Sequence, residues 1–182
     1  LDAAGQPGAP AAGDTVIVGA GASILLTNET PALAAFTMSG GTLTVSGWTS
    51  AIVAREMAIT GTVTHAANTV ASTNSLGEWV PQHRVLIQGS NLTLAAAGRI
   101  NTDTLGYRGG GAGPGCGPGG GVFDPYSYDY GGGASHGGLG GHGYYGAACG
   151  LPYGLPDWPW QPGSGGANNG GSGGGAVWIE LD

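Results

Sequence analysis

The chain has 182 residues and carries four arginines and no lysine against eleven acidic residues, which gives a net charge of −7. Binding to nucleic acid or to anionic lipid requires cations that neutralise phosphate, so neither a nucleic-acid partner nor an acidic membrane surface is expected. No apolar run approaches the roughly 20 residues that a membrane-spanning helix needs, so no membrane span is expected either.

Residues 1–13 consist almost entirely of Ala, Gly and Pro, a composition typical of a flexible arm. The composition then predicts a strand-rich body over 14–105, a glycine-rich segment over 106–175 and a strand over 176–182 that returns to the body. The first residue is Leu1 rather than Met, so we expect either a processed mature chain or a piece of a longer protein.

The body is expected to consist of short strands, because its apolar and β-branched runs are separated by Gly, Asn and Ser, and no run has helical periodicity. The expected strands are Thr15–Val18, Ser23–Thr27, Phe36–Met38, Thr42–Val45, Ile52–Val53, Met57–Thr60, Thr62–Thr64, Val85–Gln88 and Leu92–Ala95.

A weak internal repeat organises these strands. Four stretches, beginning at Val16, Phe36, Met57 and Val85, share an apolar triplet, a turn of Gly or Gly/Ser, and then apolar residues alternating with Thr or Ser. The steps are about 20, 20 and 28 residues, and the polar insert Asn68–Pro81 fills the longest. A repeat near 20 residues favours an all-β fold with a β-solenoid or β-helix-like body. A β-sandwich or jelly roll is the alternative, because a meander of hairpins also separates short strands by regularly spaced turn residues.

The glycine-rich segment is expected to be ordered, although its composition alone would favour disorder. It holds 28 of the 41 glycines between Gly109 and Gly175, yet all seven tyrosines, Phe123 and two tryptophans fall between residues 107 and 160. We interpret the segment as extended glycine strands packed side by side, since a residue without a Cβ permits close backbone approach.

The order of blocks in this segment resembles a known module. Gly131-Gly-Gly-Ala-Ser-His-Gly-Gly-Leu-Gly-Gly141 is followed by Tyr153-Gly154, by Pro162-Gly-Ser-Gly-Gly166 and by Gly170-Gly-Ser-Gly-Gly-Gly-Ala-Val-Trp-Ile-Glu-Leu181. This resembles the glycine-rich module of large bacterial β-helical surface and secreted proteins, over roughly residues 85–182. The resemblance implies architecture and an extracellular setting, and it implies no reaction.

Two kinds of residue are candidates for covalent chemistry. Cys116 and Cys149 are expected to form a disulfide that closes the glycine-rich loop, with a metal site or free thiols as alternatives. Asn28 and Asn91 each begin an Asn-x-Thr sequon and are candidate glycosylation sites.

Metal binding and catalysis are not expected. His136 and His142, with Asp124 and Asp129 nearby, form a weak candidate metal cluster, but loop histidines more often bond to backbone. The sequence has no zinc-type spacing, no nucleophile elbow and no lysine, so we expect no cofactor and no catalytic residue.

The remaining candidates are aromatic. Most rings are expected to cover glycine backbone, with Trp158 and Trp160 exposed. The candidate ligand or partner residues are Trp158, Trp160, Tyr126, Tyr128 and Tyr130. Two functions follow as hypotheses. The first is an extracellular structural subunit that assembles with copies of itself into a surface fibre or layer, and the second is a carbohydrate- or receptor-binding adhesin module. A polysaccharide-active β-helix enzyme is a distant third.

Overall fold

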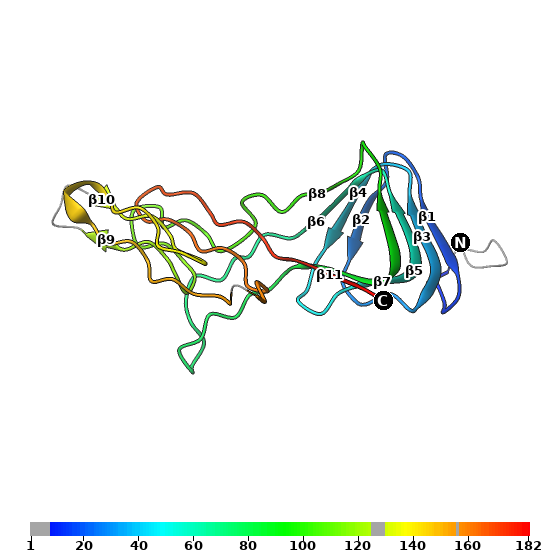
Figure 1. Ribbon diagram of the computed structural model, residues 1–182, viewed down its shortest axis with the longest axis horizontal. Coiled ribbons are helices and arrows are strands. Elements are labelled where there is room, and N and C mark those ends of the chain that lie inside the picture. The colour runs from blue at the N-terminus through cyan, green and yellow to red at the C-terminus, as the bar shows by residue number, and fades with distance from the viewer. Residues whose placement is uncertain (1–7, 125–129, 156) are drawn as a thin grey trace. The chain divides into compact units, whose positions relative to one another are not determined.

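The structure is a computed structural model that describes residues 8–124, 130–155 and 157–182. The chain divides into two compact units, one made of residues 1–66, 84–101 and 177–182 and the other of residues 67–83 and 102–176. Figure 1 shows strands and loops, and the described residues contain one short 3-10 turn, Tyr144–Gly146, and no longer helix. The predicted all-β class is therefore confirmed.

The first unit contains two parallel sheets. The five-stranded sheet has the order β1-β3-β5-β7-β11, and the four-stranded sheet has the order β2-β4-β6-β8. Successive strands of the chain alternate between the sheets up to β8. Their bounds are β1 Thr15–Val18, β2 Ser23–Leu26, β3 Leu33–Met38, β4 Thr42–Val45, β5 Ile52–Ile59, β6 Thr62–His65, β7 Val85–Leu94, β8 Arg99–Ile100 and β11 Val177–Leu181.

The repeat seen in the sequence sets the register of these strands. Val16 pairs with Phe36 and Phe36 pairs with Met57, so the first three repeats lie in register as their spacing predicts. Met57 then pairs with Leu92. The apolar residues that face inward from both sheets form one core. The buried members of that core are Val18, Leu33, Phe36, Met38, Leu43, Val45, Ile52, Ala54, Met57, Ile59, Val63, Val85 and Ile87.

Glycines recur where the chain passes from one sheet to the other. Thr42, Thr62 and Arg99 are paired in register, and each directly follows a glycine. A Cβ at Gly61 would collide with the Gly40 carbonyl, and one at Gly98 would collide with the Ile59 carbonyl. The corner therefore stacks too closely for any other residue, which explains why the repeat keeps glycine there.

The turn that the repeat beginning at Val85 predicts at Gly89-Ser90 is absent, so this prediction is wrong. Strand β7 runs unbroken from Val85 to Leu94, and the turn follows at Ala95–Gly98, where Gly98 N donates to the Ala95 carbonyl at 2.8 Å. Gly89 instead marks a close approach, because a Cβ there would meet the carbonyl of Ala54 and the methyl of Met57. The fourth repeat is therefore displaced by seven residues relative to the sequence alignment, from Val85 to Leu92.

The second unit is held together mainly by backbone hydrogen bonds between glycine segments. Residues 163–166 bond to four different stretches of chain, at residues 107–110, 116, 121 and 171–174. A strand in a sheet has only two neighbours, so this is a three-dimensional lattice, which backbone without side chains permits. Tyr107 is fully buried in this unit and meets Trp79 edge-on, with ring centroids 5.5 Å apart.

Residues 67–83, which contain the polar insert Asn68–Pro81, belong to the same unit as the lattice. Asn68 is its anchor: the side chain is buried, its Nδ2 donates to the Leu105 carbonyl at 3.1 Å, and its Oδ1 accepts from Gln82 N at 2.6 Å. One amide thus fixes both ends of the insert.

Candidate functional site

Some inward-facing rows of the first unit are closed in the middle of the stack and open at one end. One row runs through Ile52, Ile87 and Ile179, which pair in register on β5, β7 and β11. Ile52 and Ile87 are 0 % exposed, whereas Ile179 is 42 % exposed. The isoleucines of this row are therefore buried on the inner strands and partly exposed on the last strand.

The neighbouring residues of β11 follow the same rule. Val177 pairs with the fully buried Val85 but is itself 38 % exposed, and Leu181 is 47 % exposed. Three apolar side chains of one short strand are therefore turned toward a core that does not cover them.

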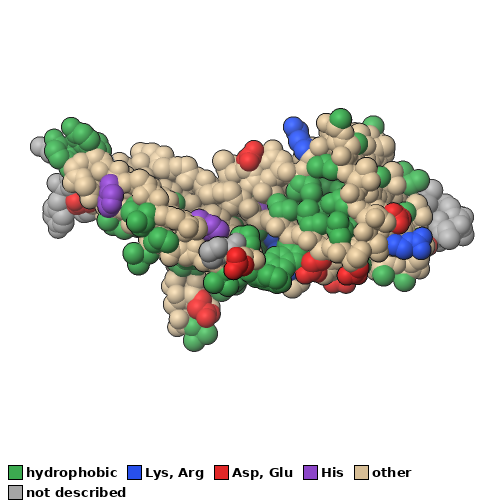
Figure 2. Space-filling view, in the orientation of Figure 1, with side chains coloured by type: hydrophobic (Ala, Val, Ile, Leu, Met, Phe, Trp, Pro, Cys, Tyr) green, Lys and Arg blue, Asp and Glu red, His purple; other side chains and the backbone are tan. Residues whose placement is uncertain are grey.

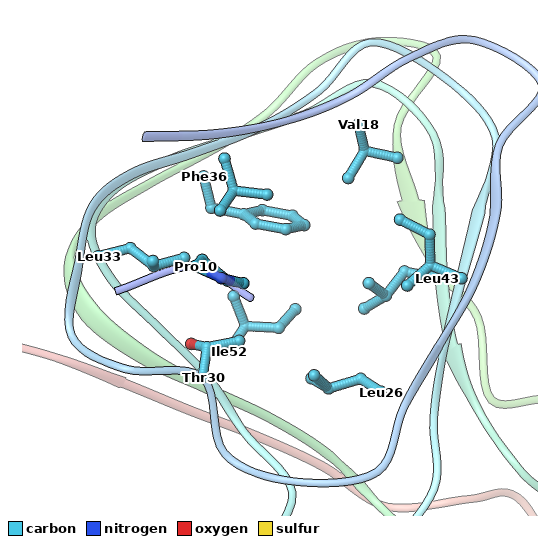
Figure 3. A pocket seen from close by; sticks show the side chains of 10 residues that line it. Pro10, Val18, Leu26, Thr30, Leu33, Phe36, Leu43 and Ile52 are labelled. Atoms are coloured by element: carbon cyan, nitrogen blue, oxygen red, sulfur yellow. The ribbon is translucent and has the colours of Figure 1, made fainter. Parts of the chain in front are cut away.

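The other end of the stack is also open. Ile24 on β2 is 36 % exposed, while its partners in the same row, Leu43 and Val63, are 3 % and 0 % exposed. Next to it lies an apolar cavity of ≈ 250 Å³. Figure 3 shows Pro10, Val18, Phe36 and Leu43 among the side chains around this space, which the backbone of the first strands encircles.

Three of the four edge strands lack the usual protection against pairing, and the fourth, β8, is protected by its two-residue length and by Arg99. Strands β1 and β11 form the edges of the five-stranded sheet, and β2 and β8 those of the other. Strands β1 and β2 contain neither a charged residue nor a proline, and β11 contains one charge, Glu180. Soluble proteins normally block open edges with charged residues, proline or a bulge, so the edges at β1, β2 and β11 can accept another strand.

Strand β11 is held at its edge by an arginine between two indoles. The guanidinium carbon of Arg84 lies 4.8 Å from the ring centroid of Trp48 and 5.9 Å from that of Trp178 on β11. Arg84 Nε also donates to the Trp48 carbonyl at 2.7 Å. The contact with Trp178 attaches β11 to Arg84 by a cation–π interaction, and the contacts with Trp48 hold Arg84 in place.

A carboxylate completes the attachment. Glu180 accepts from Gln88 Nε2 at 2.6 Å and from Trp178 Nε1 at 2.7 Å. These two hydrogen bonds, joined by the charge of Arg84, lower the pKa of Glu180. The polar contacts lie on the outward face of β11, and the apolar row on the opposite face stays open.

The two cysteines are not joined in this structure. Cys116 is buried and Cys149 is half-buried, and both belong to the glycine lattice. Cys116 contributes backbone rather than sulfur, accepting from Gly165 N at 2.9 Å. The disulfide stays a prediction.

Both sequon asparagines are exposed. Asn28 lies in the turn after β2, and Asn91 lies on β7, where its Nδ2 donates to Glu56 Oε1 at 3.0 Å. Glycosylation at either residue also stays a prediction.

The candidate aromatic residues do not form one group. Trp158 is 57 % exposed, Trp160 is half-buried, and the two belong to a loop stretch that includes the isolated bridge Leu155–Trp158. Tyr130, on the two-residue strand β10 (Tyr130–Gly131), is half-buried. Tyr126 and Tyr128 lie outside the described residues.

The sequence hypotheses did not single out Tyr144 and Tyr145, which are 64 % and 70 % exposed. Because glycines flank them in the sequence, these two rings were expected to cover glycine backbone. Their position next to Tyr130 becomes visible only in the fold. In the sequence, the adjacent Tyr-Tyr pair was the one signal that could have indicated this cluster.

The histidines and acids do not converge. Among residues 8–124, 130–155 and 157–182, no group of three or more His, Cys, Asp or Glu side chains is placed to hold a metal ion. His136 packs against Tyr153, with ring centroids 4.7 Å apart, and His142 is exposed. Asp124 lies on β9 (Phe123–Asp124), and Asp129 lies outside the described residues.

Comparison with models of protein families, with curated proteins and with solved structures gives no match for this chain. Within the part of the chain that the structure describes, no helix has the length and apolar character needed to cross a membrane.

Proposed function

We propose that this protein is an extracellular structural protein, without catalytic activity, whose strand stack is extended head to tail by copies of itself into a surface fibre or layer. The observation that carries the proposal is the row through Ile52, Ile87 and Ile179, which is closed inside the stack and 42 % exposed at its last strand. A second copy placed on β11 would cover that residue and its neighbours.

The finer proposal for the fold is a β-solenoid. It is supported by the alternation of strands between two parallel sheets and by register steps such as Val16 to Phe36 to Met57. In a solenoid each layer buries its apolar face only when another layer stacks on it, so an uncapped end favours association.

The polarity of the strands gives the mode of contact. Both sheets of the first unit are parallel, so the β1 edge of one copy and the β11 edge of another are complementary and different surfaces. A contact between two different surfaces is heterologous and does not close on itself, so it produces a filament rather than a dimer. In such a filament, the apolar cavity lined by Pro10 at one end of the stack would lie against the exposed apolar side chains of β11 in the neighbouring copy.

Sedimentation velocity over a range of concentrations tests this proposal. The wild-type chain should associate as concentration rises, and Ile179→Lys should remain monomeric, because a lysine in the open row places a charge in the contact. Ala58→Lys is the matched control: it adds the same charge at an exposed position of β5, which lies inside the sheet. A wild-type chain that stays monomeric throughout, or equal association of all three chains, would contradict the proposal.

A further inference from the structure

One end of the glycine lattice gathers exposed tyrosines. The segments alternate in direction: Ser135 N donates to the Gly119 carbonyl and Gly132 N to the Val122 carbonyl, as in antiparallel neighbours. The same alternation continues along the chain, so the turns at 110–113, 143–147 and 167–170 share an end with β9 and β10. We call this the tyrosine end. Figure 2 shows hydrophobic side chains where Figure 1 labels β10.

Three rings meet at the tyrosine end. The ring centroids of Tyr144 and Tyr145 are 4.4 Å apart, and that of Tyr130 lies 5.0 Å from Tyr144 and 5.9 Å from Tyr145. Tyr144 and Tyr145 nevertheless leave 64 % and 70 % of their surface in solvent. The rings therefore brace one another while most of their surface stays open.

The backbone under this cluster is held in an uncommon conformation. Tyr145 has φ +56°, in the left-handed region that bulky residues rarely adopt. Gly143 N donates to the Ala147 carbonyl at 2.8 Å and closes the turn around it. Residues held in sparsely populated backbone conformations cluster at functional sites, so this turn supports a binding role for the exposed rings beside it.

The charge around the cluster restricts the ligand. Arg108 is the one arginine or lysine of residues 102–176, and Asp124 on β9 is acidic. An anionic ligand would meet no cluster of cations here. Tyrosine rings joined to hydroxyl groups suit a ligand that has apolar ring faces and many hydroxyls, since each tyrosine offers a flat surface and a hydrogen-bonding group at low entropic cost.

We propose that Tyr130, Tyr144 and Tyr145 form a binding site for a neutral carbohydrate chain. The sugar rings stack on the open faces of Tyr144 and Tyr145, and Tyr130 holds both rings in place from β10. This site is independent of stacking through β11, and it gives a fibre built from such chains a glycan-binding surface on each copy.

Affinity electrophoresis in gels containing mannan, β-glucan or galactan tests the site, with alginate as the anionic comparison. Migration of the wild-type chain should be retarded by at least one neutral polysaccharide and not by alginate. The double variant Tyr144→Ala, Tyr145→Asn should bind about tenfold more weakly, and Asn tolerates the left-handed backbone at residue 145. Trp158→Ala is the matched control, since it removes an exposed aromatic ring at a loop outside the cluster.

Three outcomes would overturn the site: no retardation by any of the three neutral polysaccharides, equal retardation of the double variant, or loss of retardation in Trp158→Ala alone. The comparison is made in an Ile179→Lys background, so that changes in assembly do not alter migration. Circular dichroism of each variant must match the wild type, and a double variant that loses its fold is replaced by Tyr144→Ala alone, for which unchanged retardation contradicts the site.

Discussion

Arg84 covers the indole of Trp48 and bonds to the same residue's backbone, with its guanidinium carbon 4.8 Å from the ring centroid and its Nε 2.7 Å from the carbonyl oxygen. The second indole within reach belongs to Trp178, on the strand that returns from the far end of the sequence. One side chain therefore connects three segments that are remote in sequence.

Arg84→Ala should destabilise the first unit and loosen β11, because it removes the cation–π contact with Trp178 together with the cation–π contact and the hydrogen bond to Trp48. We expect the free energy of unfolding to fall by about 1–2 kcal/mol. Chemical denaturation followed by tryptophan fluorescence measures this. Arg55→Ala, at an exposed position of β5, is the control and should change stability by less than about 0.5 kcal/mol. An equal loss of stability in the two variants would show that the contacts of Arg84 do not stabilise the fold.

The attachment of β11 should weaken in acid. The pKa of Glu180 is lowered in the folded state by hydrogen bonds from Gln88 and Trp178. A lowered pKa contributes stability above the ordinary glutamate pKa, and that stability is lost as pH falls through the folded value. Hydrogen exchange of residues 177–181 should therefore speed up, relative to the rest of the sheet, below about pH 4.

Glu180→Gln should remove this pH dependence, since its side chain does not titrate. Glu29→Gln, in the turn after β2, should leave it intact. Acid-dependent exchange that persists unchanged in Glu180→Gln would assign the effect to another group.

The glycine lattice predicts a sharp contrast between two glycines. A Cβ at Gly165 would collide with the Arg108 carbonyl, whereas a Cβ at Gly171 meets nothing within 4 Å. Gly165→Ala should cost about 1–3 kcal/mol through displacement of neighbouring backbone, and Gly171→Ala should be neutral or slightly stabilising. Thermal unfolding of the two variants checks this, and indistinguishable midpoints would mean that the lattice is not packed as described.

The cysteines give a covalent test of the second unit. Intact mass under non-reducing conditions should show Cys116 and Cys149 joined, and by loop-closure entropy the bond would add roughly 3–4 kcal/mol of stability. Two thiols that alkylate in freshly purified native protein would exclude the disulfide.

The strands were largely predictable from the sequence because their repeat is local. The starts at Val16, Phe36 and Met57 carry the same pattern, and the structure pairs them in that register. The fourth copy was misaligned because Gly89-Ser90 has the composition of a turn. Its role depends on Ala54, which lies against it across the sheet and is 35 residues away in sequence.

The surfaces on which the two proposals rest were harder to predict, because they depend on what lies beside each residue in space. Ile179 has the sequence character of a core residue, and only its place on an edge strand exposes it. Tyr144 and Tyr145 were expected to cover glycine backbone, but the turn around Tyr145 directs their rings outward. Exposure of this kind has no local signature in sequence.

Negative-stain electron microscopy of the concentrated native chain tests head-to-tail stacking most directly. Five strands of the larger sheet per copy, at about 4.8 Å each, predict unbranched filaments with an axial repeat of about 24 Å. Ile179→Lys should abolish the filaments. Discrete single particles at every concentration, or closed rings, would contradict the account.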